Sequence, residues 1–244
     1  MTSSTSARPT AEDEGRSGRR LATLLGAAAL VMILVILALV IGVGRRGGNP
    51  PVAAPAPAPP AANPVDGAPG AATLTTAPVA RWELYQGIAV PYSPEYGPRT
   101  VQGLGPATGY SHNPAGALFA AAQLSVRAAL APDDSWRSVV ETQVLDSPGK
   151  TAFIKAREAT SIAPYTVPSS SLTQYAGFRV VNYTDSMATL GMALRTKTGS
   201  LQEGQVTVVW SGSDWRLSMQ PDGSVSSAAT VIPSLVGYIP WSGV

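Results

Sequence analysis

The sequence NPAGALFAAAQLSVRAAL (residues 113–130) decides the fold, because it predicts a long helix with almost no polar side. Asn113 is a preferred N-cap residue, and Pro114 suits the first helical position. The helix should run to about residue 130 and end before Pro132, which cannot continue it. We therefore expect one uninterrupted helix over this stretch.

Polar residues interrupt this helix only at Gln123, Ser125 and Arg127. A helix that is apolar on nearly every side is expected in a protein interior rather than on its surface. We expect a sheet to clasp this helix. The predicted core residues on it are Leu118, Phe119 and Val126.

Two amphipathic helices should follow, and Asp133 or Asp134 is expected to cap the first of them. Its apolar positions, which recur at helical spacing, are Trp136, Val139, Val140 and Val144. Its expected solvent-facing residues are Arg137, Glu141 and Gln143.

The second amphipathic helix should begin at Ser147 and Pro148, because a serine N-cap followed by proline is a helix start signal. Its apolar stripe consists of Ala152, Phe153, Ala156 and Ala159. The residues expected to face solvent are Lys155, Arg157 and Glu158.

From Phe178 onward the pattern changes to short strands rich in valine, threonine, methionine and aromatic residues. The predicted strands are residues 178–184, 187–196, 204–210 and 214–220. Alternation on both sides of the turn at 211–214 predicts a hairpin that carries Trp210 and Trp215. These tryptophans either close one end of the core, which we favour, or form a ligand-stacking pair. Residues 230–238 are expected to form a last helical stretch or a loop.

The order of these elements indicates an α+β domain over residues 81–244. Helices come first and an antiparallel meander follows. We therefore expect N-terminal helices packed on a curved antiparallel sheet that wraps the long apolar helix. A segment of this length is sufficient for one domain with its own core.

An apolar segment at residues 21–43 predicts a transmembrane helix. Its 23 residues carry no charge, and a helix of this length spans about 34 Å, enough for the hydrocarbon core of a bilayer. Four arginines precede it and two follow closely, so the positive-inside rule places residues 1–20, a disordered tail, in the cytoplasm. A cleaved secretory signal is the alternative, because residues 52–58 contain small-residue spacings of the A-x-A kind. The length of the segment and its charged lead favour a retained anchor.

Residues 44–80 are expected to form a proline- and alanine-rich linker. Residues 47–80 contain nine prolines and one charged residue, Asp66. Alternating alanine and proline favours polyproline II, which buries no core and extends far enough to hold a domain up to about 100 Å from the bilayer. A proline ligand for an aromatic groove is the alternative, but no basic residue flanks the run at 54–60 to fix its orientation.

The charge of residues 81–244 argues against nucleic-acid binding. This part holds eleven Lys and Arg against eleven Asp and Glu, so the net positive charge of the chain comes from residues 1–80. A nucleic-acid reader normally carries a cluster of basic residues interleaved with aromatic residues. We find no such cluster in the sequence and expect no direct contact with nucleic acid.

Residues suited to catalysis are few. The chain has no cysteine and one histidine, His112, so a serine–histidine–aspartate triad would have to use that residue. A histidine just before a helix is usually a turn residue or a hydrogen-bond donor, and no G-x-S-x-G elbow accompanies it. Tyr183, Asp185 and Asp214 could reach a pocket together with His112, although isolated aspartates at strand ends are usually turn formers. We therefore predict no catalytic residue, no metal ligand and no cofactor.

Four sequence blocks carry a resemblance to a known family: GYSHNPAGALFAAAQ (109–123), WRSVV (136–140), VVWSGSDWRL (208–217) and GYIPWSGV (237–244). With them the chain resembles uncharacterised actinobacterial membrane-anchored proteins of integrative conjugative elements. The order of anchor, linker, helices and sheet is also similar to scaffold components of type IV secretion and conjugation machines. That resemblance implies a nuclear transport factor 2-like cone and a role in assembling a transfer channel.

The sequence as a whole favours a single-pass membrane protein whose extracytoplasmic domain acts as a structural or protein-interaction scaffold. The implied partners are the membrane and other envelope or secretion-apparatus proteins, with self-association as a further option. We expect no enzymatic activity. The alternative is an extracytoplasmic ligand-binding or hydrolytic domain with a pocket between sheet and helices.

Overall fold

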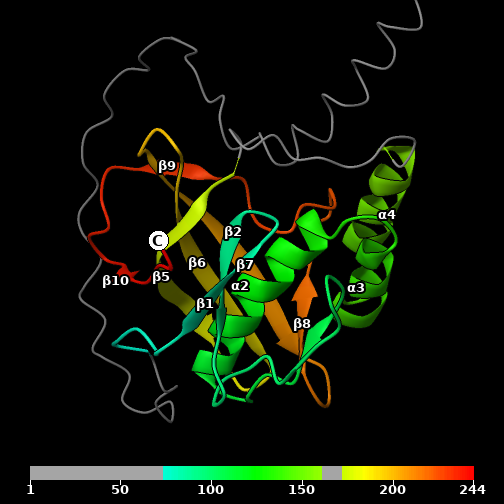
Figure 1. Cartoon of the computed structure of the whole chain (residues 1–244), viewed down its shortest axis with the longest axis horizontal. Helices are drawn as coiled ribbons and strands as arrows, with labels where there is room; N and C mark the ends of the chain where they lie inside the picture. The colour runs from blue at the N-terminus through cyan, green and yellow to red at the C-terminus, as the bar shows by residue number, and fades with distance from the viewer. Residues whose placement is uncertain (1–73, 161–171) are drawn as a thin grey trace, which may run out of the picture.

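The computed structural model describes residues 74–160 and 172–244, which form an α+β fold of helices and mostly antiparallel sheet (Figure 1). The predicted tail, the transmembrane segment at 21–43 and most of the linker lie outside the described residues, so these stay predictions. Within the described part of the chain, no helix combines the length and hydropathy that a bilayer crossing requires.

Helix α2 (Pro114–Leu130) begins and ends where the sequence predicts. The backbone N–H of Gly116 donates to Asn113 Oδ1 at 2.8 Å, so Asn113 caps the helix. The predicted core residues Leu118, Phe119 and Val126 are all buried. Burial of each such side chain stabilises the fold by about 1.5–3 kcal/mol.

The strands predicted from Phe178 onward form the main sheet. Its long strands, which pair antiparallel in chain order, are β5 (Gln174–Tyr183), β6 (Met187–Arg195), β7 (Leu201–Trp210) and β8 (Trp215–Ser218). Trp210 lies opposite Trp215 in the β7–β8 hairpin, as predicted. A short strand, β10 (Ile239–Pro240), pairs with the free edge of β5. Alternate residues of β7 are buried, and Val206 and Val208 belong to the core that contains α2.

The segment 230–238 contains a strand where a helix was one of two expectations. Strand β9 (Thr230–Ile232) pairs antiparallel with the start of β7, and the chain then turns towards Tyr238. The helical alternative is therefore wrong, and the loop alternative holds only after Ile232. Three consecutive β-branched residues explain the preference for a strand.

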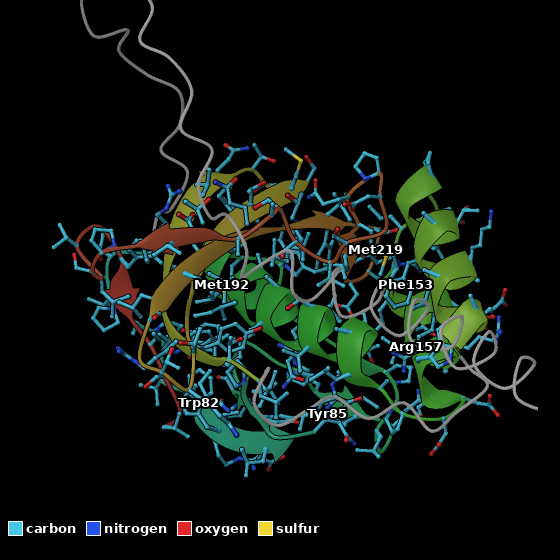
Figure 2. All side chains as sticks on the ribbon, turned by 90° about the horizontal axis from the view of Figure 1, so that it is seen from above. Trp82, Tyr85, Phe153, Arg157, Met192 and Met219 are labelled. Atoms are coloured by element: carbon cyan, nitrogen blue, oxygen red, sulfur yellow. The ribbon has the colours of Figure 1, made fainter. Side chains whose placement is uncertain are left out.

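Two strand pairs precede the helices, and the predicted helices-first order did not include them. They are the hairpin of β1 (Arg81–Tyr85) with β2 (Ile88–Tyr92), and the short pair of β3 (Thr100–Val101) with β4 (Ala107–Thr108). Gln86 and Gly87 both have positive φ, which is the geometry of a two-residue hairpin turn. Figure 2 shows α2 between this hairpin and the main sheet. The helix is apolar on nearly every side because both of these layers cover it.

Buried Arg127 joins α2 to the first hairpin. Its guanidinium donates to Gly105 O at 2.7 Å, to Tyr92 Oη at 3.0 Å and to Gln123 Oε1 at 2.9 Å. It also lies 4.5 Å from the centre of the Tyr85 ring. Burying a cation is costly unless its donors are bonded. Of the three polar residues that interrupt α2, Gln123 and Arg127 therefore bond to the hairpin side of the fold.

Helices α3 (Ser135–Gln143) and α4 (Pro148–Thr160) form where the sequence predicts them and pack at one side of the domain (Figure 1). Asp134 occupies the N-cap position of α3, but its side chain makes no capping hydrogen bond. Ser147 does cap α4, because its Oγ accepts from the N–H of Lys150 at 3.1 Å. The predicted apolar positions of α3, all buried, are Trp136, Val139, Val140 and Val144. On α4, Phe153 is buried, whereas Ala159 is exposed.

Two residues predicted to face solvent, Gln143 and Arg157, are buried instead. The amide group of Gln143 exchanges hydrogen bonds with the backbone of Ala107, with the N–H to Oε1 distance at 3.1 Å. Arg157 donates to Ala131 O at 2.7 Å and to Ala129 O at 3.2 Å. Carbonyl groups at a helix end lack helical partners and attract cations, which explains the position of Arg157 beside the end of α2. The other residues predicted to face solvent are exposed: Arg137, Glu141, Lys155 and Glu158.

Candidate functional site

His112 lies in an aromatic cluster at the N-terminal end of α2. Its ring stacks on Trp210, with the ring centres 3.9 Å apart and the planes 7° from parallel. The centre of the Trp215 ring lies 5.7 Å from His112 and 6.2 Å from Tyr183. His112 Nε2 bonds to the carbonyl oxygen of Asp185, so this nitrogen carries a proton. The structure thus brings together His112, Tyr183 and the two tryptophans of the predicted hairpin.

Asp214 fixes the β7–β8 turn to the loop before α2. Its carboxylate accepts from the N–H groups of Gly109 at 2.8 Å, Tyr110 at 3.1 Å and Trp215 at 2.9 Å. Gly109 lies 105 positions earlier in the chain, so Asp214 is more than a local turn former. Charge-assisted bonds of this kind are strong. Within the described residues, no hydrogen bond joins Asp214 to His112.

A separate pocket lies between the C-terminal half of α2 and the main sheet. It encloses about 180 Å³. Residues 222–229, between β8 and β9, form much of its rim. None of His112, Tyr183, Asp185 and Asp214 lines it. The side chains that make up its walls include Val126, Leu130, Met192, Leu194 and Val206.

Two buried hydroxyl groups that line this pocket are already bonded to α2. Tyr175 Oη donates to Ala122 O at 2.8 Å, and Ser125 Oγ donates to Ala121 O at 2.7 Å. Burial raises the pKa of Tyr175 to about 12, so its phenol is neutral near pH 7. The pocket therefore offers a ligand mainly apolar surface. Among the described residues, no group of three or more histidine, aspartate and glutamate side chains is arranged to hold a metal ion.

The outer face of the main sheet carries a polar cluster that was not predicted from the sequence. Arg179 on β5 donates to Glu203 Oε1 on β7 through Nε at 3.0 Å and Nη2 at 2.6 Å. This pair crosses β6 at Gly191, where an added Cβ would lie 2.3 Å from the same oxygen. Tyr238 donates to the other oxygen of Glu203. The only sequence signal was a lone glycine within a strand, which often marks a close approach.

A pair of tryptophans joins the two ends of the described fold. The Trp82 and Trp241 rings meet edge to face, with their centres 4.8 Å apart. Trp241 Nε1 donates to Pro78 O at 3.1 Å, and Gly243 lies against the Trp82 ring. The C-terminal residues are therefore packed on β1, close to Pro78, which precedes that strand.

Three exposed apolar residues lie on the segments that form this tryptophan pair and its contacts. Val79 follows Pro78, and Leu84 lies two residues after Trp82 on the same side of β1. The third, Val244, follows the glycine that contacts Trp82. These three residues, here named the Trp82 patch, are 89% (Val79), 73% (Leu84) and 78% (Val244) exposed. No sequence pattern marks this surface, because it depends on the packing of the C-terminus against β1.

A family model matches most of the chain. Its description is Domain of unknown function (DUF8175), and the match covers residues 46–240. No curated protein and no solved structure matches the chain. The match includes every described element from β1 to β10. The chain therefore belongs to the DUF8175 family.

Proposed function

We propose that this protein is a single-pass membrane protein whose domain at residues 81–244 lies outside the membrane and serves as a protein-interaction scaffold. The observation that carries the proposal is the Trp82 patch, a set of exposed apolar side chains on the segments that hold two packed tryptophans. Grouped apolar surface of this kind is typical of protein contact sites. The patch lies where the linker joins the domain, so a partner held there would lie on the side of the tether.

The contacts of the chemistry-bearing residues support a role without catalysis. The carboxylate of Asp214 is occupied by three backbone N–H groups. His112 is stacked on Trp210 and bonded to a backbone carbonyl. A general base needs an open position within hydrogen-bond reach of its substrate. The pocket beside α2 contains neither of these groups.

The position in the cell is proposed from the sequence. Residues 21–43 would span the membrane with residues 1–20 in the cytoplasm, and the linker would hold the domain above the bilayer. The partners would be other envelope or secretion-apparatus proteins, or further copies of this chain. A role in a conjugative, type IV secretion-like apparatus rests on the resemblance of the sequence blocks.

We also propose that the domain is a nuclear transport factor 2-like cone. The support is the antiparallel order of β5 to β8, with α2 packed on the inner face of that sheet. The hairpin of β1 and β2 on the other side of α2 would then be an addition to the cone. This hairpin carries Leu84 and Trp82, so the addition would bring the proposed contact surface.

The test compares four variants in membranes from cells that express the full chain at matched levels. Leu84→Lys places a charge in the Trp82 patch, and Val231→Lys is its control because Val231 is 70% exposed on β9, which pairs with β7 and not with β1. The other two variants are His112→Ala and a chain with the 47–80 segment shortened. The readout is the mass of the detergent-extracted complex on native gels.

We expect Leu84→Lys to release the protein from its complex, because binding the partner would bury the unpaired charge of the lysine. We expect the shortened linker to have the same effect, because it moves the domain towards the bilayer. Val231→Lys and His112→Ala should leave the complex intact. A complex that is lost with His112→Ala but retained with Leu84→Lys would overturn the proposal.

A further inference from the structure

The pocket beside α2 exists because small residues face one another there. Ser125 and Ala129 on α2 lie across from Gly204 on β7. At the other end of the helix the same space is filled by rings, such as Phe119 against Trp241 at 5.3 Å. Protein interiors are otherwise close-packed, and an empty space forfeits contact energy. A ligand that fills this space would therefore add contacts to the core.

The size and walls of the pocket select a hydrocarbon. Its volume of about 180 Å³ is close to that of an engineered apolar cavity that binds benzene, so it suits about six to eight carbon atoms. Its apolar walls are aliphatic or methionine side chains, with Tyr175 as the one aromatic ring among its described lining residues. The polar residues of that lining are Ser125, Thr173, Asp222, Ser224, Ser226 and Ser227. Methionine adapts its shape to a flexible chain. The buried hydroxyls of Tyr175 and Ser125 are already bonded to α2, and the other polar side chains of the described lining come from residues 173 and 222–227.

The mouth of the pocket is polar and negative. Among the described lining residues only Asp222 and Ala228 are exposed, so the mouth lies along residues 222–229. Asp222 is also the one charged residue in that set. Its carboxylate accepts from the N–H of Ser224 at 2.9 Å and from the Ser224 hydroxyl, and these bonds lower the pKa of Asp222. An anionic head group would meet a like charge at this mouth, whereas a neutral or cationic one would not.

We propose that this pocket binds an unbranched alkyl chain whose polar head is neutral or cationic. The chain end lies between Ser125 and Gly204, and the head lies beside Asp222. The source of the chain is either a single-chain amphiphile or one acyl chain of a zwitterionic phospholipid, which share this chemistry. This inference goes beyond the scaffold role and does not depend on it.

The experiment uses the full chain in nanodiscs of a branched-chain phosphatidylcholine, so that straight alkyl chains come only from the added probe. The probe is decanol with a photoreactive diazirine near the end of its chain. After irradiation, peptide mass spectrometry identifies the labelled residues. We expect label on the peptides that contain Leu130, Met192 and Val206.

Competition with unlabelled compounds tests the head group. Decyltrimethylammonium should suppress labelling at a concentration about tenfold lower than decanoate does. The reason is that the carboxylate of decanoate is negative, like that of Asp222, and is repelled by it. In Asp222→Asn this difference should disappear. Equal competition by the two compounds in the unmodified protein would overturn the assignment of the head group.

Two variants fill the pocket from opposite walls. Gly204→Val adds a side chain beside Ser226, because a Cβ at position 204 would lie 3.2 Å from Ser226 Oγ. Ala129→Leu extends from α2 with little loss of helix propensity. Each should lower labelling by about tenfold, which corresponds to about 1.4 kcal/mol of binding free energy. Thr207→Leu, on the outer face of β7, is the matched control and should label normally.

A final arm distinguishes the two sources with a phosphatidylcholine that carries the diazirine in one straight chain. Label from this lipid on the same peptides identifies the membrane as the source, and label from decanol alone identifies a free amphiphile. Unchanged labelling in both filled variants, or label confined to other peptides, would overturn the proposed site.

Discussion

Replacement of Phe119 by alanine should destabilise the domain strongly. The Phe119 side chain is completely buried, and its ring lies 5.3 Å from the centre of Trp241 and 5.7 Å from that of Tyr96. Removal of a buried phenylalanine ring costs about 3–5 kcal/mol. We expect the upper half of that range, because two ring pairs of about 0.5–1.5 kcal/mol each are lost with the side chain. At a typical urea dependence, a loss of about 4 kcal/mol lowers the unfolding midpoint by about 2 M.

The assay is urea unfolding of the full chain followed by tryptophan fluorescence. All five tryptophans lie in residues 81–244, so the signal reports on this domain alone. Phe153→Ala is the control, because Phe153 is 7% exposed and has a more distant ring partner, Trp136 at 6.2 Å. Its loss of stability should be smaller. A loss below about 1 kcal/mol in Phe119→Ala would place α2 outside the core and refute the fold.

Three further predictions concern the sheet, the buried phenol and the membrane. Gly191→Val should separate Arg179 from Glu203 and cost about 1–3 kcal/mol; an unchanged urea midpoint would contradict this. The unfolded Tyr175 phenol ionises near pH 10 and the folded one near pH 12. The free energy of unfolding should therefore stay constant below pH 10 and fall as the pH rises to 12, and this residue should contribute about 2–3 kcal/mol to the fall. The test is urea unfolding at both pH values, where Tyr175→Phe should reduce the fall and an equal fall would refute the assignment. Protease added to intact wall-stripped cells should remove the outer domain and spare a tag on residues 1–20, and full protection of the domain would disprove this topology.

Helix α2 and the β7–β8 hairpin could be predicted because their signals are local. Asn113 and Pro114 mark the helix start within a few residues. Trp210 and Trp215 lie on strands joined by a short turn, so alternation alone sets their pairing. The first hairpin was missed because its turn, at Gln86 and Gly87, lacks the asparagine or aspartate that usually precedes the glycine.

Features that depend on packing between distant segments could not be predicted. Arg157 has the sequence position of a solvent-facing residue, yet it bonds to carbonyls at the end of α2. The pocket is lined by residues from Ile88 to Ala229, which no local pattern connects. His112 and Trp210 meet across about a hundred residues for the same reason. Sequence periodicity reports which side of an element is buried, and it does not report what that side meets.

Photo-cross-linking at Leu84 in intact cells tests the scaffold proposal most directly. A photoreactive amino acid replaces Leu84 in one strain and Val231 in another, since the two positions are similarly exposed, at 73% and 70%. We predict a cross-linked product of one defined mass from position 84 and none from position 231, because only the first lies in the Trp82 patch. No product from position 84, or the same product from both positions, would contradict the account.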